Sequence, residues 1–140
     1  MTETTADSML DVDLGDAGEL ETLKEGEYQL TILRADIQDS KSHNDRVNLR
    51  LCMEDASNPN IDDIYVYLPV PNSEWKAADP KSHKKGSNRF KDFIDAFSVD
   101  MPLEVSRLIG LVGWALVAEE ADDRDGSMRN QVRRFVVGKK

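Results

Sequence analysis

Apolar and polar residues alternate in three stretches of the first half of the chain, and a period of two is typical of half-buried strands. Within residues 23–38 the apolar phase slips by one position, which predicts a β-bulge that bends the strand. Residues 46–54 alternate without interruption. Residues 63–68 also alternate, and they place Tyr65 and Tyr67 on the face that the aliphatic residues leave free. We therefore predict three strands in this part of the chain.

Helical spacing replaces the alternation in the next part of the chain. Residues 69–87 contain three prolines and are predicted to form a long loop, because proline interrupts regular structure. In residues 87–97 three phenylalanines and an isoleucine recur at helical spacing, which predicts a helix with Ser87 as its N-cap. A shorter helical piece is predicted at residues 101–110, where a proline stands near the start and a glycine at the end.

The last part of the chain alternates again. Residues 114–122 and 130–138 predict the two strands of a hairpin, with Asp125 and Gly126 as its turn. The predicted order is therefore three strands, one helix and two strands, which is the layout of the mainly β, five-stranded oligonucleotide/oligosaccharide-binding (OB) barrel. Ligands of that fold bind on the second and third strands and on the loops beside them.

The length of 140 residues is enough for one domain with a single core. Residues 1–22 are acidic and contain no aromatic residue, so they cannot bury enough apolar surface to offset the entropy of ordering. We therefore predict a disordered acidic tail at residues 1–22 and an OB-fold domain at residues 23–140.

The net charge of −9 is unevenly distributed along the chain. Residues 1–25 carry eight acidic residues and one lysine, so they hold most of the excess. Residues 76–91 instead carry six basic residues and one acidic residue, and residues 129–140 carry five basic residues and no acidic one. Two basic segments suit a nucleic-acid ligand, because phosphates attract Lys and Arg whatever the base sequence.

Aromatic and basic side chains are predicted to share the outer face of the second and third strands. This combination forms an aromatic platform edged by cations. Bases stack on aromatic rings at roughly 1 to 3 kcal/mol per base, so the platform suits single strands better than duplexes, whose base faces are hidden. The candidate contacts with single-stranded DNA are Tyr65, Tyr67, Arg46, Asn48, Arg50, Trp75, Lys76, Lys81, Lys84, Lys85, Arg129, Arg133 and Arg134.

Several of these residues also have an ordinary structural interpretation. Two exposed tyrosines on one strand can simply pack against cross-strand neighbours. The lysine-rich residues 81–85 can be a solvated loop rather than a flap that folds over a bound strand. Trp75 can plug one end of the barrel, and Trp114 and Phe135 are better explained as packing residues.

We predict no enzymatic activity, no metal and no cofactor. The chain lacks a G-x-S-x-G motif and a phosphate-binding glycine loop. One cysteine, Cys52, cannot complete a structural zinc site with His43 and His83, which are distant in sequence. The stretch DDRDG resembles part of a calcium loop, but Ala121 and Val132 would occupy the first and twelfth ligand positions, so a hairpin turn explains it better.

The stretches LKEGEYQLTILRADI, SNRFKDFIDAF and LIGLVGWALVAEE resemble the landmarks of a family of bacteriophage proteins found among replication and recombination genes. The resemblance covers roughly residues 23–137. It implies an OB fold, single-stranded DNA binding in support of phage DNA replication or recombination, and no catalysis. Such a protein would work in the cytoplasm of the host cell, and no apolar run here approaches the length of a membrane span.

The acidic tail has an unusual position for such a protein. Many single-strand binders carry their acidic tail at the C-terminus, where it competes with DNA and recruits partners, whereas this chain ends in GKK. We hypothesise that the tail lies in the basic track when DNA is absent. Recruitment of replication or recombination proteins and simple solubilisation are the alternatives for it.

A protein-binding adaptor or inhibitor, built on the same barrel and engaging a partner through the acidic tail, is the alternative function. A duplex-DNA mimic fits less well, because the acidic residues crowd one tail instead of spreading over a folded surface. The sequence leaves open whether DNA or RNA is preferred and whether strand edges pair to form a homo-oligomer.

Overall fold

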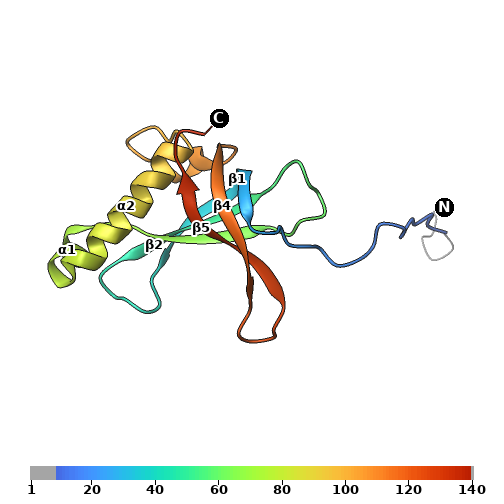
Figure 1. Cartoon of the computed structure of the whole chain (residues 1–140), viewed down its shortest axis with the longest axis horizontal. Coiled ribbons are helices and arrows are strands. Elements are labelled where there is room, and N and C mark those ends of the chain that lie inside the picture. The colour runs from blue at the N-terminus through green and yellow to red at the C-terminus, as the bar shows by residue number, and fades with distance from the viewer. Residues whose placement is uncertain (1–8, 140) are drawn as a thin grey trace, which may run out of the picture.

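The structure of the protein is a computed structural model, and it describes residues 9–139. It is mainly β, with one antiparallel sheet of five strands in the order β3-β2-β1-β4-β5. Figure 1 shows the helices gathered on one side of the sheet and the N-terminal segment leaving on the other. The strands are β1 (Gly26–Asp39), β2 (Val47–Glu54), β3 (Ile64–Pro69), β4 (Val112–Ala121) and β5 (Met128–Val136).

β1 is the central strand and is shared between two halves of the sheet. Its residues Gly26–Thr31 pair with β4, and its residues Thr31–Asp39 pair with β2. The register with β2 shifts between Ile32 and Arg34, which confirms the predicted bulge. Because a bulge bends its strand, β1 can serve both halves, and the edge strands β3 and β5 approach each other.

The predicted loop at residues 69–87 is wrong, because this segment forms helix α1 (Ser73–Ala78) and the start of helix α2 (Pro80–Ala96). The side chain of Asn72 accepts a hydrogen bond from the backbone N–H of Trp75 and thereby caps α1. Asp79 caps α2 in the same way, and Pro80 occupies its first turn, where proline is tolerated. Ser87 lies inside α2 and is not an N-cap.

The C-terminal elements agree more closely with the prediction. The hairpin of β4 and β5 is confirmed, and Gly126 in its turn adopts a φ of 74°, which only glycine reaches without strain. The helical piece predicted at residues 101–110 is shorter than expected, a single 3₁₀ turn η2 (Val105–Leu108).

The core lies between the sheet and α2. Phe93 of α2 and Phe97, the C-cap of that helix, pack on Phe135 of β5, with ring centroids 5.4 and 6.0 Å apart. Leu30 of β1 and Leu51 of β2 are completely buried in the same cluster. The phenylalanines at helical spacing therefore bury the apolar face of α2 against the curled sheet, which leaves the opposite face of β1, β2 and β3 available.

The N-terminal segment joins the folded domain slightly earlier than predicted. Glu21 forms a parallel bridge with Ile61, and the N–H of Leu23, which is buried, donates to Asn130 Oδ1 at 2.8 Å. Residues 9–20 are exposed and contain no helix or strand. The part of the predicted tail at residues 1–8 lies outside the described residues.

Neither α1 nor α2, the α-helices of residues 9–139, combines the length and the apolar composition that a membrane crossing requires.

Candidate nucleic-acid interface

The outer face of β1, β2 and β3 places aromatic and charged side chains in two cross-strand rows. Strand register decides which residues meet, because side chains directly opposite one another lie within contact distance. The rows run from β1 through β2 to β3 and consist of Arg34, Cys52 and Tyr65 in one, and Asp36, Arg50 and Tyr67 in the other.

Tyr65 lies across the sheet surface rather than pointing straight into solvent. Its hydroxyl accepts a hydrogen bond from Arg34 Nη2 at 3.2 Å, although Arg34 is two strands away. Cys52 lies between them, and its Sγ also accepts from Arg34 Nη2 at 3.2 Å. Cys52 is only 3% exposed on this outer face, whereas Tyr65 is 49% exposed. We infer that the Tyr65 side chain leans along the sheet toward Cys52 and Arg34 while about half of the residue stays exposed.

Arg50 is held by Asp36 in the second row. Its Nε and Nη2 donate to the two carboxylate oxygens of Asp36 at 3.0 and 2.8 Å, a bidentate geometry that fixes the guanidinium plane. These hydrogen bonds raise the pKa of Arg50. Tyr67 stands directly opposite Arg50 on β3 and is 52% exposed.

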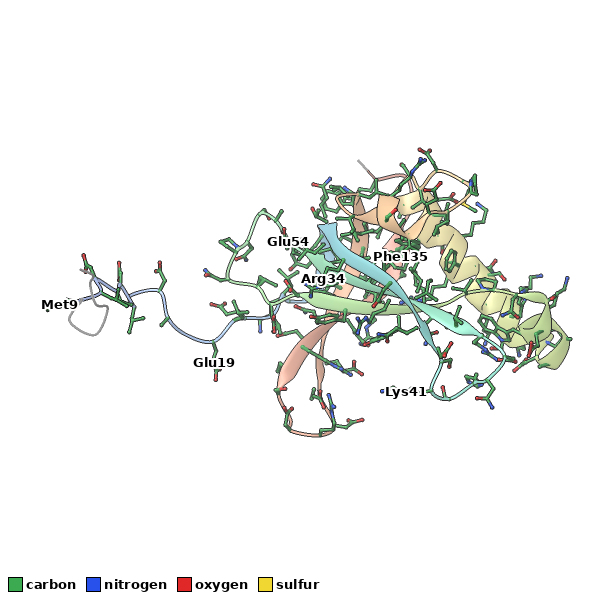
Figure 2. The ribbon with its side chains drawn as sticks, turned by 180° about the vertical axis from the view of Figure 1, so that it is seen from behind. Met9, Glu19, Arg34, Lys41, Glu54 and Phe135 are labelled. Carbon is green, nitrogen blue, oxygen red and sulfur yellow. The ribbon has the colours of Figure 1, made fainter. Side chains whose placement is uncertain are left out.

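Two hollows flank the tyrosines. One, of about 340 Å³, is lined by the first row together with Arg50, Asp36 and Ile109. The other, of about 470 Å³, begins at Tyr67 and is lined further on by Lys85 of α2. The β1–β2 loop also lines this second hollow, and Figure 2 shows Arg34 over the strands and Lys41 on that loop. The face is therefore a platform with a recess at each end.

Trp75 is placed differently from the predicted contact with a bound strand. It is 2% exposed, and its Nε1 donates to Ser82 Oγ at 3.2 Å. The Arg46 guanidinium stacks on its ring, 4.0 Å from the centroid, and is paired with Asp45 at 2.8 Å. In this arrangement the indole is closed to a base, so we leave Trp75 out of the proposed stacking set.

The predicted lysines lie on helices instead of a loop, which corrects the expectation of a flap. Lys76 is exposed on α1. Lys81, Lys84 and Lys85 are exposed on α2, where spacings of three and four residues place them on one face. Lys85 is the lysine that reaches the hollow beside Tyr67.

The predicted arginines of β5 are not brought to the tyrosine platform as a group. Arg129 faces Glu120 and Asp122 at 3.8 and 3.9 Å. Arg134 faces Glu27 at 3.9 Å, on the half of the sheet where β1 pairs with β4. The exposed Arg133 shares this strand, and its contribution to a continuous positive track stays a prediction.

The structure adds residues to the face that sequence reasoning did not name. Arg34 and Asp36 both come from β1, after the bulge. The slip of the apolar phase contained the signal, because it transfers the polar positions after Leu33 to the outer face. Arg89 was also missed; it donates to the carbonyl oxygen of Val132 at 3.3 Å and lines the hollow beside Tyr67.

Within residues 9–139, no three His, Cys, Asp or Glu side chains gather so that they could hold a metal ion. Burial raises the pKa of Cys52, which disfavours the reactive thiolate. His83 packs edge-on against Trp75, with ring centroids 5.6 Å apart.

The resemblance to a family of phage proteins gains no support from comparison with known proteins and stays a prediction. A scan of protein-family models and a search of curated proteins each found no match to this chain.

Proposed function

We propose that this chain is a sequence-tolerant single-stranded DNA-binding protein with an OB-type barrel, and that it supports DNA replication or recombination without catalysing a reaction. The observation that carries the proposal is the position of Tyr65, which is 49% exposed while its hydroxyl meets the guanidinium of Arg34, two strands away. From this contact we infer that the ring leans along the sheet. A ring that points straight outward would offer a base only its edge, whereas a ring held along the sheet offers a face.

Two tyrosines at this spacing suit consecutive nucleotides. Alternate residues of a strand are roughly 6.5 to 7 Å apart, since each residue adds about 3.3 Å, and Tyr65 and Tyr67 therefore form two adjacent stacking positions. Stacking is tolerant of base identity, because every base has a π-face. Arg34 and Lys85 stand near the two ends of the platform and supply charge for the backbone.

The OB assignment is supported by connectivity. The central strand β1 pairs with both β2 and β4, and the long helix α2 lies between β3 and β4 in the chain. OB-type domains bind oligonucleotides on their second and third strands, where the two tyrosines and Arg50 are found.

Fluorescence anisotropy with a labelled single strand of about 30 bases, long enough for more than one OB-type site, tests the proposal directly. The matching duplex and an RNA of the same sequence serve as competitors, over a series of salt concentrations. We expect binding to the single strand, weak competition by the duplex and a steep loss of affinity with salt. Absence of binding at low salt would contradict the proposal.

An adaptor function is the second candidate, and one observation favours it. Met9, Leu10, Val12 and Leu14 are 61 to 96% exposed among acidic residues at the N-terminal end of the described chain. Apolar side chains spaced between acids suit a partner with a basic, apolar groove. If the full chain fails to bind single strands, this candidate becomes the leading one.

A further inference from the structure

The pair of Asp36 and Arg50 occupies the middle of the proposed binding face. Asp36 lies on β1 and Arg50 on β2, and Tyr67 completes the row on β3. Both members are accessible, with side chains 48% and 38% exposed. A carboxylate at the centre of a face for a polyanion is unexpected, because it repels phosphates.

Arg50 is unsuited to phosphate binding while Asp36 holds it. Two of its nitrogens are committed to the carboxylate, so a phosphate would have to displace Asp36 or approach a pair with no net charge. Arg34 and Lys85 differ, because neither has a carboxylate within 4.0 Å among residues 9–139. The cationic character of the face is therefore weak in its middle and stronger at its ends.

We propose that Asp36 determines the specificity of this face by neutralising Arg50, so that the middle accepts uncharged bases and phosphates stay at the ends near Arg34 and Lys85. The inference rests on the proposed function. It implies discrimination against polyanions that offer charge without exposed bases, such as duplex DNA and heparin. A free arginine in the same place would attract any polyanion.

The variant Asp36→Asn tests the inference, because it keeps the side-chain shape and releases the charge of Arg50. Binding to the labelled single strand is measured over a salt series, with heparin and duplex DNA as competitors. We expect the slope of log affinity against log salt to steepen by about 0.7, the value for one added phosphate contact on a single strand. We also expect heparin and duplex to compete severalfold better than against the parent protein.

Asp100→Asn is the matched control, since Asp100 is exposed outside the face and its change alters the net charge equally. The double variant Asp36→Asn with Arg50→Gln restores a neutral middle, so we expect its salt slope and its heparin competition to return to the parent values. Circular dichroism and thermal unfolding confirm that each variant is folded.

Three outcomes would overturn the inference. The first is that Asp36→Asn keeps the salt slope and the selectivity of the parent. The second is that Asp100→Asn reproduces the effect of Asp36→Asn. The third is that the double variant has a shallower salt slope than the parent, which would mean that Arg50 contacts a phosphate in the parent. Each of these leaves single-strand binding by the parent intact. Failure of the parent itself to bind would instead contradict the proposed function, so the two failures are distinguishable.

Discussion

Cys52 shows how one residue reports the arrangement of its neighbours. It lies on the outer face of β2 and is nevertheless buried, and its Sγ accepts from the same Arg34 nitrogen that donates to the Tyr65 hydroxyl. We infer that these two side chains shield it. A small side chain at this position leaves room for the ring to lie along the sheet. The accessibility of the thiol is therefore a measure of the geometry on which the proposed function depends.

Replacing Tyr65 by Ala should uncover Cys52 and speed its reaction with a thiol reagent. In the parent, burial raises the pKa of the thiol, so little thiolate is present near pH 8 and the rate should continue to rise at higher pH. In the variant the thiol gains solvent and also loses a hydrogen bond from Tyr65 that lowers its pKa. Because burial is the larger cause, we expect the pKa to fall toward the ordinary value and the rise to begin at lower pH. Labelling by a chromogenic disulfide over a pH series measures this reaction rate.

Tyr67→Ala is the control, because Tyr67 stands opposite Arg50 and not Cys52. Equal labelling rates in the parent and both variants would contradict the inference that Tyr65 shields Cys52.

Loss of both tyrosine rings should weaken single-strand binding while the fold persists. Each ring is about half exposed, so truncation removes little of the core. If each ring stacks one base, Tyr65→Ala combined with Tyr67→Ala should cost roughly 2 to 6 kcal/mol of binding free energy. Anisotropy at fixed salt measures the loss, and Tyr28→Phe, which alters a tyrosine on β1 outside the platform, is the control. Unchanged affinity of the double variant would assign the pair to cross-strand packing.

At the scale of elements, α1 and α2 meet at the indole of Trp75, which contacts Ser82, His83 and Gly86 of α2. Trp75 of α1 packs beneath α2 at Gly86, where a Cβ atom would come within 2.2 Å of the indole. Glycine is ordinarily unfavourable inside a helix, so its presence in the middle of α2 has a steric cause. This contact fixes the position of α2, and α2 places Lys85 at the hollow beside Tyr67.

Gly86→Ala should therefore destabilise the protein, although the same change in an open helix stabilises it by about 1 kcal/mol. Overpacking of a filled site costs roughly 1 to 3 kcal/mol, because the indole or α2 must move. Urea unfolding followed by tryptophan fluorescence gives the free energy of unfolding. Asn88→Ala, an exposed position in the same helix, should be neutral or slightly stabilising. A stability gain for Gly86→Ala equal to that of the control would mean that Trp75 is not packed at this point.

At the scale of the whole molecule, the acidic segment of residues 9–20 is attached to the folded domain close to β3. The bridge of Glu21 to Ile61 attaches it to the loop that connects β2 to β3. The 12 residues from 9 to 20 are exposed, and a chain of this length reaches at most about 40 Å when extended. Figure 1 shows this segment leading away from the sheet.

Deletion of residues 1–19 tests whether this segment competes with DNA. It removes acidic residues and keeps Glu21, which is bridged to Ile61, and Leu23, whose N–H donates to Asn130 of β5. If the segment occupies the basic track when DNA is absent, the deletion should raise single-strand affinity at low salt, and the difference should fade as salt screens the attraction. A chain of the same length with the acids of residues 1–19 changed to their amides separates charge from length. Equal affinity of the parent and the deletion at low salt would refute the hypothesis.

The sequence alone determined the elements whose signal is local. Alternation located all five strands, the phase slip located the bulge, and the phenylalanine spacing located the apolar face of α2, because pleat and helical pitch repeat over a few residues. It failed at residues 69–87, where three prolines suggested a loop. The caps Asn72 and Asp79 were present in that stretch, but their role depends on the backbone around them.

Only the tertiary structure decided which side chains meet. Arg34 and Tyr65 are 31 residues apart in the chain, and the register of three strands brings them together. The same register sets Asp36 against Arg50, while the packing of α1 under α2 hides Trp75. A repeat along the chain shows which face a residue occupies, but long-range pairing selects its neighbour on that face. The shared outer face of Tyr65, Tyr67 and Arg50 was thus readable from the sequence, whereas the charge balance of that face and the burial of Trp75 were not.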